Sequence, residues 1–266
     1  TNGTGMNRIT RNSVMLLAAT LWLAALPAMA LDAQAIFERN EYALYQIRVI
    51  NRETGKKSSI GSGFIFDRSN RLATNYHVVS TFIEKSDSYE LRYLAADGTE
   101  GPLRLIAVDA VHDLALVEAD EILGAPLAVG EPPAKGAGLF AMGNPLDLGL
   151  TIAAGTNGFS GSLNPGMSGG PTFDDQGVVV GINVSTAHND ISFIVPTRYL
   201  VKLTMADAAS PGALLADIGQ QIRNYQVGYL DGIVAAPWPT TTLRNLEMPG
   251  AISPTIRCWD ASTKPE

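Results

Sequence analysis

The chain has 266 residues, of which 46% are apolar and 17% charged, and it carries a net charge of -7. This composition supplies a core for one large or two small domains, and the acidic balance argues against general nucleic-acid binding. The frequent Gly (26) and Pro (15) residues are typical of an all-β protein with many turns. One cysteine, Cys258, excludes an internal disulfide framework. The three histidines are scattered along the chain, so we expect no metal site and no cofactor.

Residues 1–30 are predicted to be a signal peptide. Arg8 and Arg11 precede an apolar run over residues 14–25, and Ala28-Met29-Ala30 forms a small-x-small cleavage signal. The alternative is an uncleaved membrane anchor, for which the run is short. We therefore expect an exported protein, periplasmic or secreted, with no stable membrane insertion after cleavage.

Short apolar segments separated by turn residues follow. Asp32 is placed to cap a short helix that ends near Asn40. Strands are expected at residues 42–50, 61–66, 72–75, 89–95, 103–108, 113–118, 139–142, 151–154, 178–184 and 191–195. Residues 51–59, 67–70 and 174–177 are expected to form turns or loops. Many short strands without alternating helices favour antiparallel barrels or sandwiches, and two small barrels fit the length.

A shift in composition divides the chain. Residues 124–138 are rich in Gly, Pro and Ala, which indicates a linker between two halves. We predict an N-terminal β-barrel over residues 31–123 and a C-terminal β-barrel over residues 124–203. A C-terminal extension of unknown role follows at residues 204–266. Within it, residues 213–223 have the periodicity of an amphipathic helix, and residues 233–258 are Pro-rich and apolar.

The segment NPGMSGGP at residues 164–171 places Ser168 among three glycines and between two prolines. Glycine permits conformations and close approaches that a Cβ forbids, and proline fixes φ. Such a segment suits an acyl-transfer nucleophile, which needs an exposed hydroxyl and nearby amide donors. The alternative is a Gly-rich turn that carries an incidental serine.

A serine nucleophile needs a general base and a residue that orients it. His188 lies in a polar loop, and His112 is expected to face away from an inward-facing Asp113. His77 follows an apolar strand, at the expected start of a turn, where catalytic side chains are often held. Asp113 begins an apolar strand and Asp109 competes for the same role. His77, Asp113 and Ser168 follow the order His, Asp, Ser, one of the known triad orders.

Five segments together resemble the chymotrypsin-fold (trypsin-like) serine proteases, closest to their bacterial HtrA/Deg-like branch. They are residues 61–66, 72–79, 113–117, 141–145 and 164–171, the last followed by 177–183, and the resemblance covers roughly residues 42–203. It implies two antiparallel β-barrels with the active site between them, and no cofactor. The short C-terminal extension and the lack of a Gly-Leu-Gly-type loop lead us to expect no PDZ domain.

The resemblance also implies roles for individual residues. His77 would be the general base and then the general acid, Asp113 would orient it, and Ser168 would attack the scissile carbonyl. The backbone N–H groups of Gly166 and Ser168 would form the oxyanion hole. The primary pocket would lie at Ser162, Ile191, Ser192 and Phe193, where no acid is available for Lys or Arg. We therefore expect a small or medium apolar side chain at the cleaved position.

Met167 departs from the family pattern, because digestive relatives have an acid there that pairs with a newly cut N-terminus. Methionine cannot form that pair, so we expect no zymogen switch of that kind, and the sequence leaves open what holds the loop. The predicted function is that of an exported serine endopeptidase acting on proteins or peptides. The alternatives are a non-catalytic binding module or regulator on the same fold, and an esterase with the same triad. The sequence does not indicate an oligomeric state.

Overall fold

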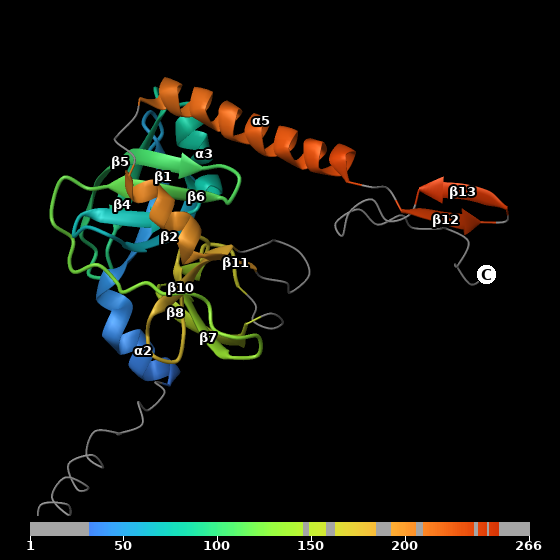
Figure 1. Cartoon of the computed structure of the whole chain (residues 1–266). Coiled ribbons are helices and arrows are strands. Elements are labelled where there is room, and N and C mark those ends of the chain that lie inside the picture. Colours follow the sequence, from blue (N-terminus) through green and yellow to red (C-terminus); the bar gives the residue numbers. More distant parts are fainter. Residues whose placement is uncertain are drawn as a thin grey trace, which may run out of the picture.

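The first half of the chain forms a closed antiparallel barrel with the strand order β1-β2-β3-β6-β5-β4 (Figure 1). The computed structural model describes residues 32–145, 149–157, 163–184, 193–205, 210–236, 239–243 and 245–249. The barrel strands are β1 (Leu44–Asn51), β2 (Lys57–Ile65), β3 (Arg71–Thr74), β4 (Tyr89–Leu94), β5 (Glu100–Asp109) and β6 (Leu114–Glu118). Closure pairs β1 with both β2 and β4, which removes the open edges that would invite pairing with other chains.

Apolar side chains from all six strands fill the barrel. Alternate residues of a strand point to opposite faces, so inward positions such as Ile47, Phe64 and Leu91 are buried. The expected strands are confirmed, with shifted ends: β2 begins at Lys57, inside the segment expected to be a loop, and β5 begins before Pro102. The shifts arise because register with a neighbouring strand, and not local composition, decides where a ladder ends.

The second half contains a five-stranded antiparallel sheet with the order β11-β10-β9-β7-β8. Its strands are β7 (Gly138–Gly143), β8 (Thr151–Thr156), β9 (Pro171–Phe173), β10 (Val179–Val184) and β11 (Phe193–Pro196). β9 was not expected from the sequence. It follows directly on the candidate nucleophile segment and pairs with both β7 and β10. The division of the chain at residues 123 and 124 stays a prediction.

Helices connect and flank the two halves. Asp32 caps α2 (Ala33–Asn40) as predicted, and its carboxylate accepts from Ala35 N at 2.8 Å. α2 contacts β7 and β8 of the second half. The prediction of a turn after β3 is wrong, because the helix α3 (Tyr76–Glu84) begins there. The short helices α4 (Thr197–Val201) and η3 (Lys202–Met205) follow β11.

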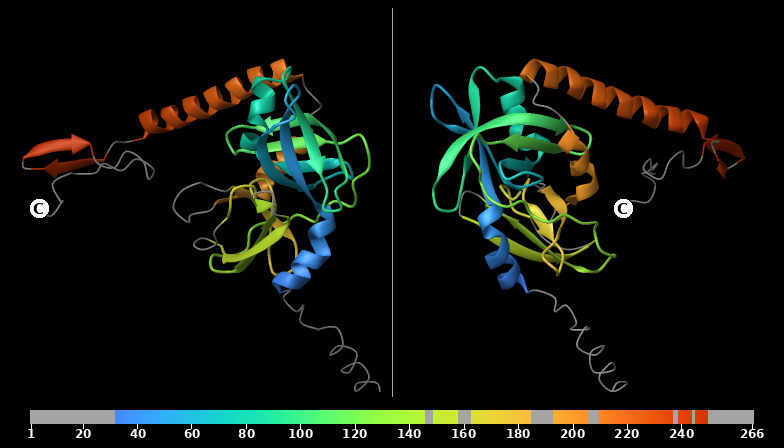
Figure 2. Two further views of the ribbon diagram at one scale, coloured as in Figure 1. Left: turned by 180° about the vertical axis from the view of Figure 1, so that it is seen from behind. Right: turned by 60° about the vertical axis from the view of Figure 1, so that its left-hand side comes forward.

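The helix α5 (Pro211–Ala235) is longer than the predicted segment and extends away from the barrel in every view (Figures 1 and 2). Its first turns pack on α3 and β5 through Leu214 and Ile218, both of which are buried. A small hairpin of β12 (Thr240–Leu243) and β13 (Leu246–Pro249) lies beyond its far end. None of the helices described is long and apolar enough to span a bilayer.

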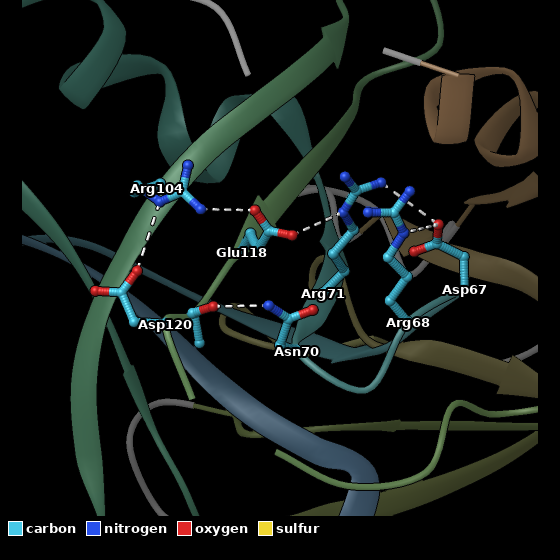
Figure 3. A network of polar contacts seen from close by, with 8 residues as sticks. Asp67, Arg68, Asn70, Arg71, Arg104, Glu118 and Asp120 are labelled. Atoms are coloured by element: carbon cyan, nitrogen blue, oxygen red, sulfur yellow. Dashed lines mark hydrogen bonds and ion pairs between the residues drawn. The ribbon is translucent and has the colours of Figure 1, made fainter. Parts of the chain in front are cut away.

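A network of charged side chains links neighbouring strands of the barrel (Figure 3). Arg71 on β3 is buried, and its Nε lies 3.1 Å from Glu118 Oε1 on β6, the strand with which it pairs. Arg104 of β5 binds the other oxygen of Glu118 at 2.7 Å. Arg71 also lies 3.5 Å from Asp67. Burial raises the pKa of the Asp67 carboxyl, against the lowering effect of Arg71 and Arg68. The network thus ties β3, β5 and β6 together.

Candidate active site

His77 and Asp113 form a two-point contact. Asp113 Oδ1 accepts from the backbone N–H of His77 at 2.9 Å, and Asp113 Oδ2 lies 2.7 Å from His77 Nδ1. A carboxylate at Nδ1 favours the tautomer that carries its proton on that nitrogen, which leaves Nε2 free to accept a proton. The His77 side chain is 46% exposed and that of Asp113 is 28% exposed. The pair is therefore oriented like the base and acid of a triad and remains open to solvent.

The Asp113 carboxylate also takes the place of a helix cap. The first N–H groups of a helix lack partners, and an anion there is favoured by the helix dipole. Asn75 is the N-cap residue of α3 but makes no side-chain cap bond. Its Nδ2 instead donates to the carbonyl of Asp113 at 2.8 Å, while its buried Oδ1 has no hydrogen-bond partner. Asn75 thus holds the backbone carbonyl of Asp113, and the first turn of α3 holds its carboxylate.

The segment that carries Ser168 is folded as its glycines predicted. Gly166 and Gly169 have positive φ values of 97° and 85°, in the region that favours glycine. A Cβ on Gly169 would lie 2.2 Å from the carbonyl oxygen of Ser62 and 3.1 Å from the backbone nitrogen of Asn75. The nucleophile segment thus packs directly against the segment of the first barrel that leads into His77.

Two buried polar side chains hold this segment. Ser62 Oγ on β2 donates to the carbonyl of Gly166 at 2.7 Å and accepts from the backbone N–H of Asn144 at 2.8 Å. Asn183 on β10 donates from Nδ2 to the carbonyls of Met142 (2.8 Å) and Met167 (3.3 Å).

Backbone bonds complete the frame of the nucleophile segment. The N–H of Ser62 donates to the carbonyl of Ser168 at 2.7 Å. The N–H of Gly169 donates to the carbonyl of Asn183 at 3.0 Å. The segment is therefore bound to both halves of the chain, on each side of Ser168.

Met167 answers the question that the sequence left open. Its side chain is 1% exposed and packs in a small apolar cluster with Ala141 and Leu163. A Cβ on Gly143 would lie only 2.7 Å from Met167 Cα, so β7 needs glycine at this point for the segment to approach. Packing and neutral hydrogen bonds hold this loop.

Tyr76 is the ionisable residue that precedes His77 in the chain. It is partly buried against the main core, next to His77 in the chain. Burial raises the pKa of its phenol, and the negative charges of Glu84 and Asp113 raise it further. Tyr76 therefore stays neutral at any pH at which the pair would work, and it adds no competing charge.

The structure brings His77 and Asp113 into contact and places Gly166 and Ser168 in one turn, in which Ser168 is buried and Gly166 is half-buried. Of the predicted pocket residues, Ser162, Ile191 and Ser192 lie outside the described residues, and Phe193 at the start of β11 is 57% exposed. The residues at positions 1–30 and 258 also lie outside. No group of three or more His, Cys, Asp or Glu side chains in the described ranges is arranged to hold a metal ion.

Three supporting residues were missed from the sequence: Ser62, Asn75 and Asn183. Ser62 and Asn75 lie in segments that carried the family resemblance, and so does Asn183. Their side-chain partners lie up to 104 positions away in the chain, so no local pattern could have assigned them a role.

Comparison with known proteins finds similarity to trypsin-like peptidases. Residues 61–182 match the trypsin-like peptidase domain. Protease Do-like 1, chloroplastic, of Arabidopsis thaliana is 28% identical over 165 residues, which cover 51% of this chain and 36% of the relative. A probable periplasmic serine endoprotease DegP-like of Rhizobium meliloti is 33% identical over 160 residues, 51% of this chain and 31% of the relative. The matches thus cover only about a third of these two relatives.

Solved structures show the same fold. The crystal structure of Deg5 superposes with a TM-score of 0.53 at 22% identity, covering 63% of this chain and 89% of the other. The serine endoprotease from Yersinia pestis gives 0.56 at 24% identity, covering 67% and 66%. The fold is thus the chymotrypsin-like fold of these neighbours, and residues 61–182 are similar to the trypsin-like peptidase domain and to DegP-like serine proteases.

Proposed function

We propose that this chain is an exported serine endopeptidase that hydrolyses peptide bonds through His77, Asp113 and Ser168. The observation that carries the proposal is the double contact of the Asp113 carboxylate with the N–H and Nδ1 of His77, at 2.9 and 2.7 Å. That contact presents a base with its tautomer fixed. The Ser168 segment packs against the strand end that leads into the same histidine.

The proposed reaction follows the acyl-enzyme route. Ser168 Oγ attacks the scissile carbonyl while His77 Nε2 takes its proton, and the imidazolium then gives this proton to the leaving amine. Asp113 stabilises the imidazolium through Nδ1. Water, activated by the same histidine, hydrolyses the ester and restores Ser168.

The backbone N–H groups of Gly166 and Ser168 would stabilise the oxyanion, each contributing on the order of 3 kcal/mol in the transition state. The positive φ of Gly166 supports this role, because a side chain would strain the peptide in that conformation. The Ser62 hydroxyl binds the carbonyl of the same residue and restricts rotation of its peptide. A loop held in this way needs no proteolytic step to assemble.

Export rests on the leader at residues 1–30 and on the periplasmic naming of several relatives. The substrates would be proteins or peptides with a small or medium apolar residue before the cleaved bond. A fusion of residues 1–40 to a reporter enzyme tests export, because a functional leader places reporter activity outside the cytoplasm and leaves a product cut near residue 30. A fusion with Arg8 and Arg11 changed to Glu is the control.

Covalent labelling tests the catalytic proposal. A fluorophosphonate probe should label the wild type on Ser168, and the Ser168→Ala variant should neither label nor cleave an unfolded protein such as reduced casein. Ser58→Ala is the matched control, since Ser58 is an exposed serine on the same barrel strand as Ser62 and should change nothing. Absence of both labelling and cleavage in the folded wild type would favour the binding-module alternative. Turnover of esters without peptides would favour the esterase.

A further inference from the structure

A second histidine–aspartate pair lies directly beside the proposed triad acid. Asp109 Oδ1 accepts from the backbone N–H groups of Val111 (3.1 Å) and His112 (2.9 Å), and Asp109 Oδ2 lies 2.7 Å from His112 Nδ1. One carboxylate thus engages three nitrogens of the turn that ends at Asp113. The His112 side chain is only 32% exposed, which limits its freedom further.

The His112 ring contacts the second half of the chain. It stacks on the ring of Tyr199 with a centroid separation of 3.8 Å and an angle of 18° between planes. Tyr199 belongs to α4, which follows directly on β11. The guanidinium of Arg198 and the ammonium of Lys202 lie 4.9 and 5.6 Å from the Tyr199 ring centre, at cation–π distances. The stack therefore joins the two halves, with the His112 ring held by Asp109 and the Tyr199 ring contacted by two cations.

Asp113 itself has a strained backbone. Its φ is 56°, in the left-handed region that costs a residue with a side chain about 1–2 kcal/mol. Such a conformation persists only where its surroundings determine it. Asn75 holds the carbonyl of Asp113 on one side, at 2.8 Å. On the other side Asp113 shares a peptide bond with His112, whose N–H and ring are both fixed by Asp109.

We propose that His112 is a positioning residue for the triad acid. Through its hydrogen bond to Asp109 and its stack on Tyr199, it holds the Asp113 carboxylate at His77 and ties that position to the β11–α4 segment of the second half. The inference rests on the proposed function, since it assigns a role within the same site. The second half of the fold thereby supports the orientation of the catalytic base in the first half.

Substitutions separate the two contacts. His112→Asn keeps an N–H donor for Asp109 but loses the stack, and His112→Phe keeps the stack but loses the donor. We expect each to lower kcat about threefold and His112→Ala about tenfold, with KM unchanged within about twofold. Tyr199→Ala should resemble His112→Asn. Tyr199→Phe retains the ring and should match the wild type.

A double-mutant cycle of His112 and Asp113 shows whether His112 acts through Asp113. In an Asp113→Ala background, His112→Ala should lower the remaining activity by less than about twofold, because the group it positions is gone. A full tenfold loss in that background would overturn the proposal. So would a rise in KM with unchanged kcat in His112→Ala, since that pattern belongs to substrate binding.

Nuclear magnetic resonance separates this proposal from the proposed function. The chain has only three histidines, so ¹⁵N-labelled rings give few signals. In Ser168→Ala protein, His77 should show a single Nδ1-protonated tautomer, and His112→Ala or Tyr199→Ala should convert it to a mixture. Unchanged His77 signals in both variants would refute the positioning role. The histidine signals test the positioning role whether or not the wild type cleaves peptides. A wild type that cleaves no peptide would refute the proposed peptidase function and leave the positioning role to be decided by these signals.

Discussion

Replacement of Ser62 by alanine should destabilise the chain and impair the oxyanion loop at the same time. The Ser62 side chain is fully buried, and its hydroxyl joins the carbonyl of Gly166 to the N–H of Asn144 at 2.7 and 2.8 Å. The alanine variant removes both bonds and leaves two backbone groups without these partners.

The size of the effect follows from these two groups. An unsatisfied buried polar group costs about 1–3 kcal/mol. Asn144 is buried, whereas Gly166 is half-buried and its carbonyl can recover a bond to water. We therefore expect a loss of about 2–3 kcal/mol in the free energy of unfolding. The Gly166 peptide would also gain freedom to rotate its N–H out of the oxyanion hole, so kcat should fall at least about tenfold.

Urea unfolding followed by tryptophan fluorescence measures the first effect, and steady-state cleavage of a peptide ester and amide measures the second. Ser58→Ala is the control, because an exposed serine on the same strand should change stability by less than about 0.5 kcal/mol. If Ser62→Ala matched Ser58→Ala in both measurements, the hydroxyl would not hold the loop and the reasoning would be refuted.

Three further predictions concern the site and the barrel. Asp113→Asn should lower kcat about 10⁴-fold by allowing the wrong His77 tautomer, whereas Asp109→Asn should lower it about tenfold at most; equal losses in peptide hydrolysis would contradict the assignment. Gly169→Ala should cost about 3 kcal/mol or more in urea unfolding, because its Cβ would lie 2.2 Å from a carbonyl oxygen at a φ of 85°; Gly136→Ala, with a φ of 86° and no atom within 4 Å, should cost only about 1 kcal/mol. Burial, with the hydrogen bond to Glu121, raises the pKa of Tyr93 to about 12. The stabilisation that the neutral Tyr93 contributes is therefore complete below pH 10 and declines as the pH approaches 12. The difference in unfolding free energy between wild type and Tyr93→Phe should shrink over that range, and a constant difference would exclude the effect.

Much of the fold could be predicted because its signals are local. Alternating burial marks β4 and β5, where inward residues such as Leu91 and Leu103 alternate with outward ones. The cap at Asp32 and the turn at residues 174–177 follow from the chemistry of a few neighbouring residues. The glycines of the nucleophile segment indicated its unusual backbone in the same way.

The rest depends on contacts distant in sequence. The first turns of α3 contain Val78, Val79 and Thr81, which have low helix propensity, so the sequence suggested a turn. The helix forms because the Asp113 carboxylate caps it from 36 positions away. β9 has three residues and begins at a proline, which is too little for a strand signal, and only its pairing with β7 and β10 defines it.

The assignment of the acid was open for the same reason. Asp109 and Asp113 are four positions apart and each is suited to bind a histidine. Asp109 binds His112, three positions away, and Asp113, just before β6, binds His77, which follows the neighbouring strand β3. Sequence spacing cannot distinguish a local partner from a distant one, but the hydrogen bonds of the β5–β6 connection do.

The burial of Met167 has a consequence for how the molecule would respond to its surroundings. The groups that hold this loop, a thioether, a hydroxyl, an amide side chain and backbone peptides, do not change charge between about pH 4 and pH 10. Neutral contacts are also little affected by ionic strength. The oxyanion loop should therefore keep its shape in acid and in high salt.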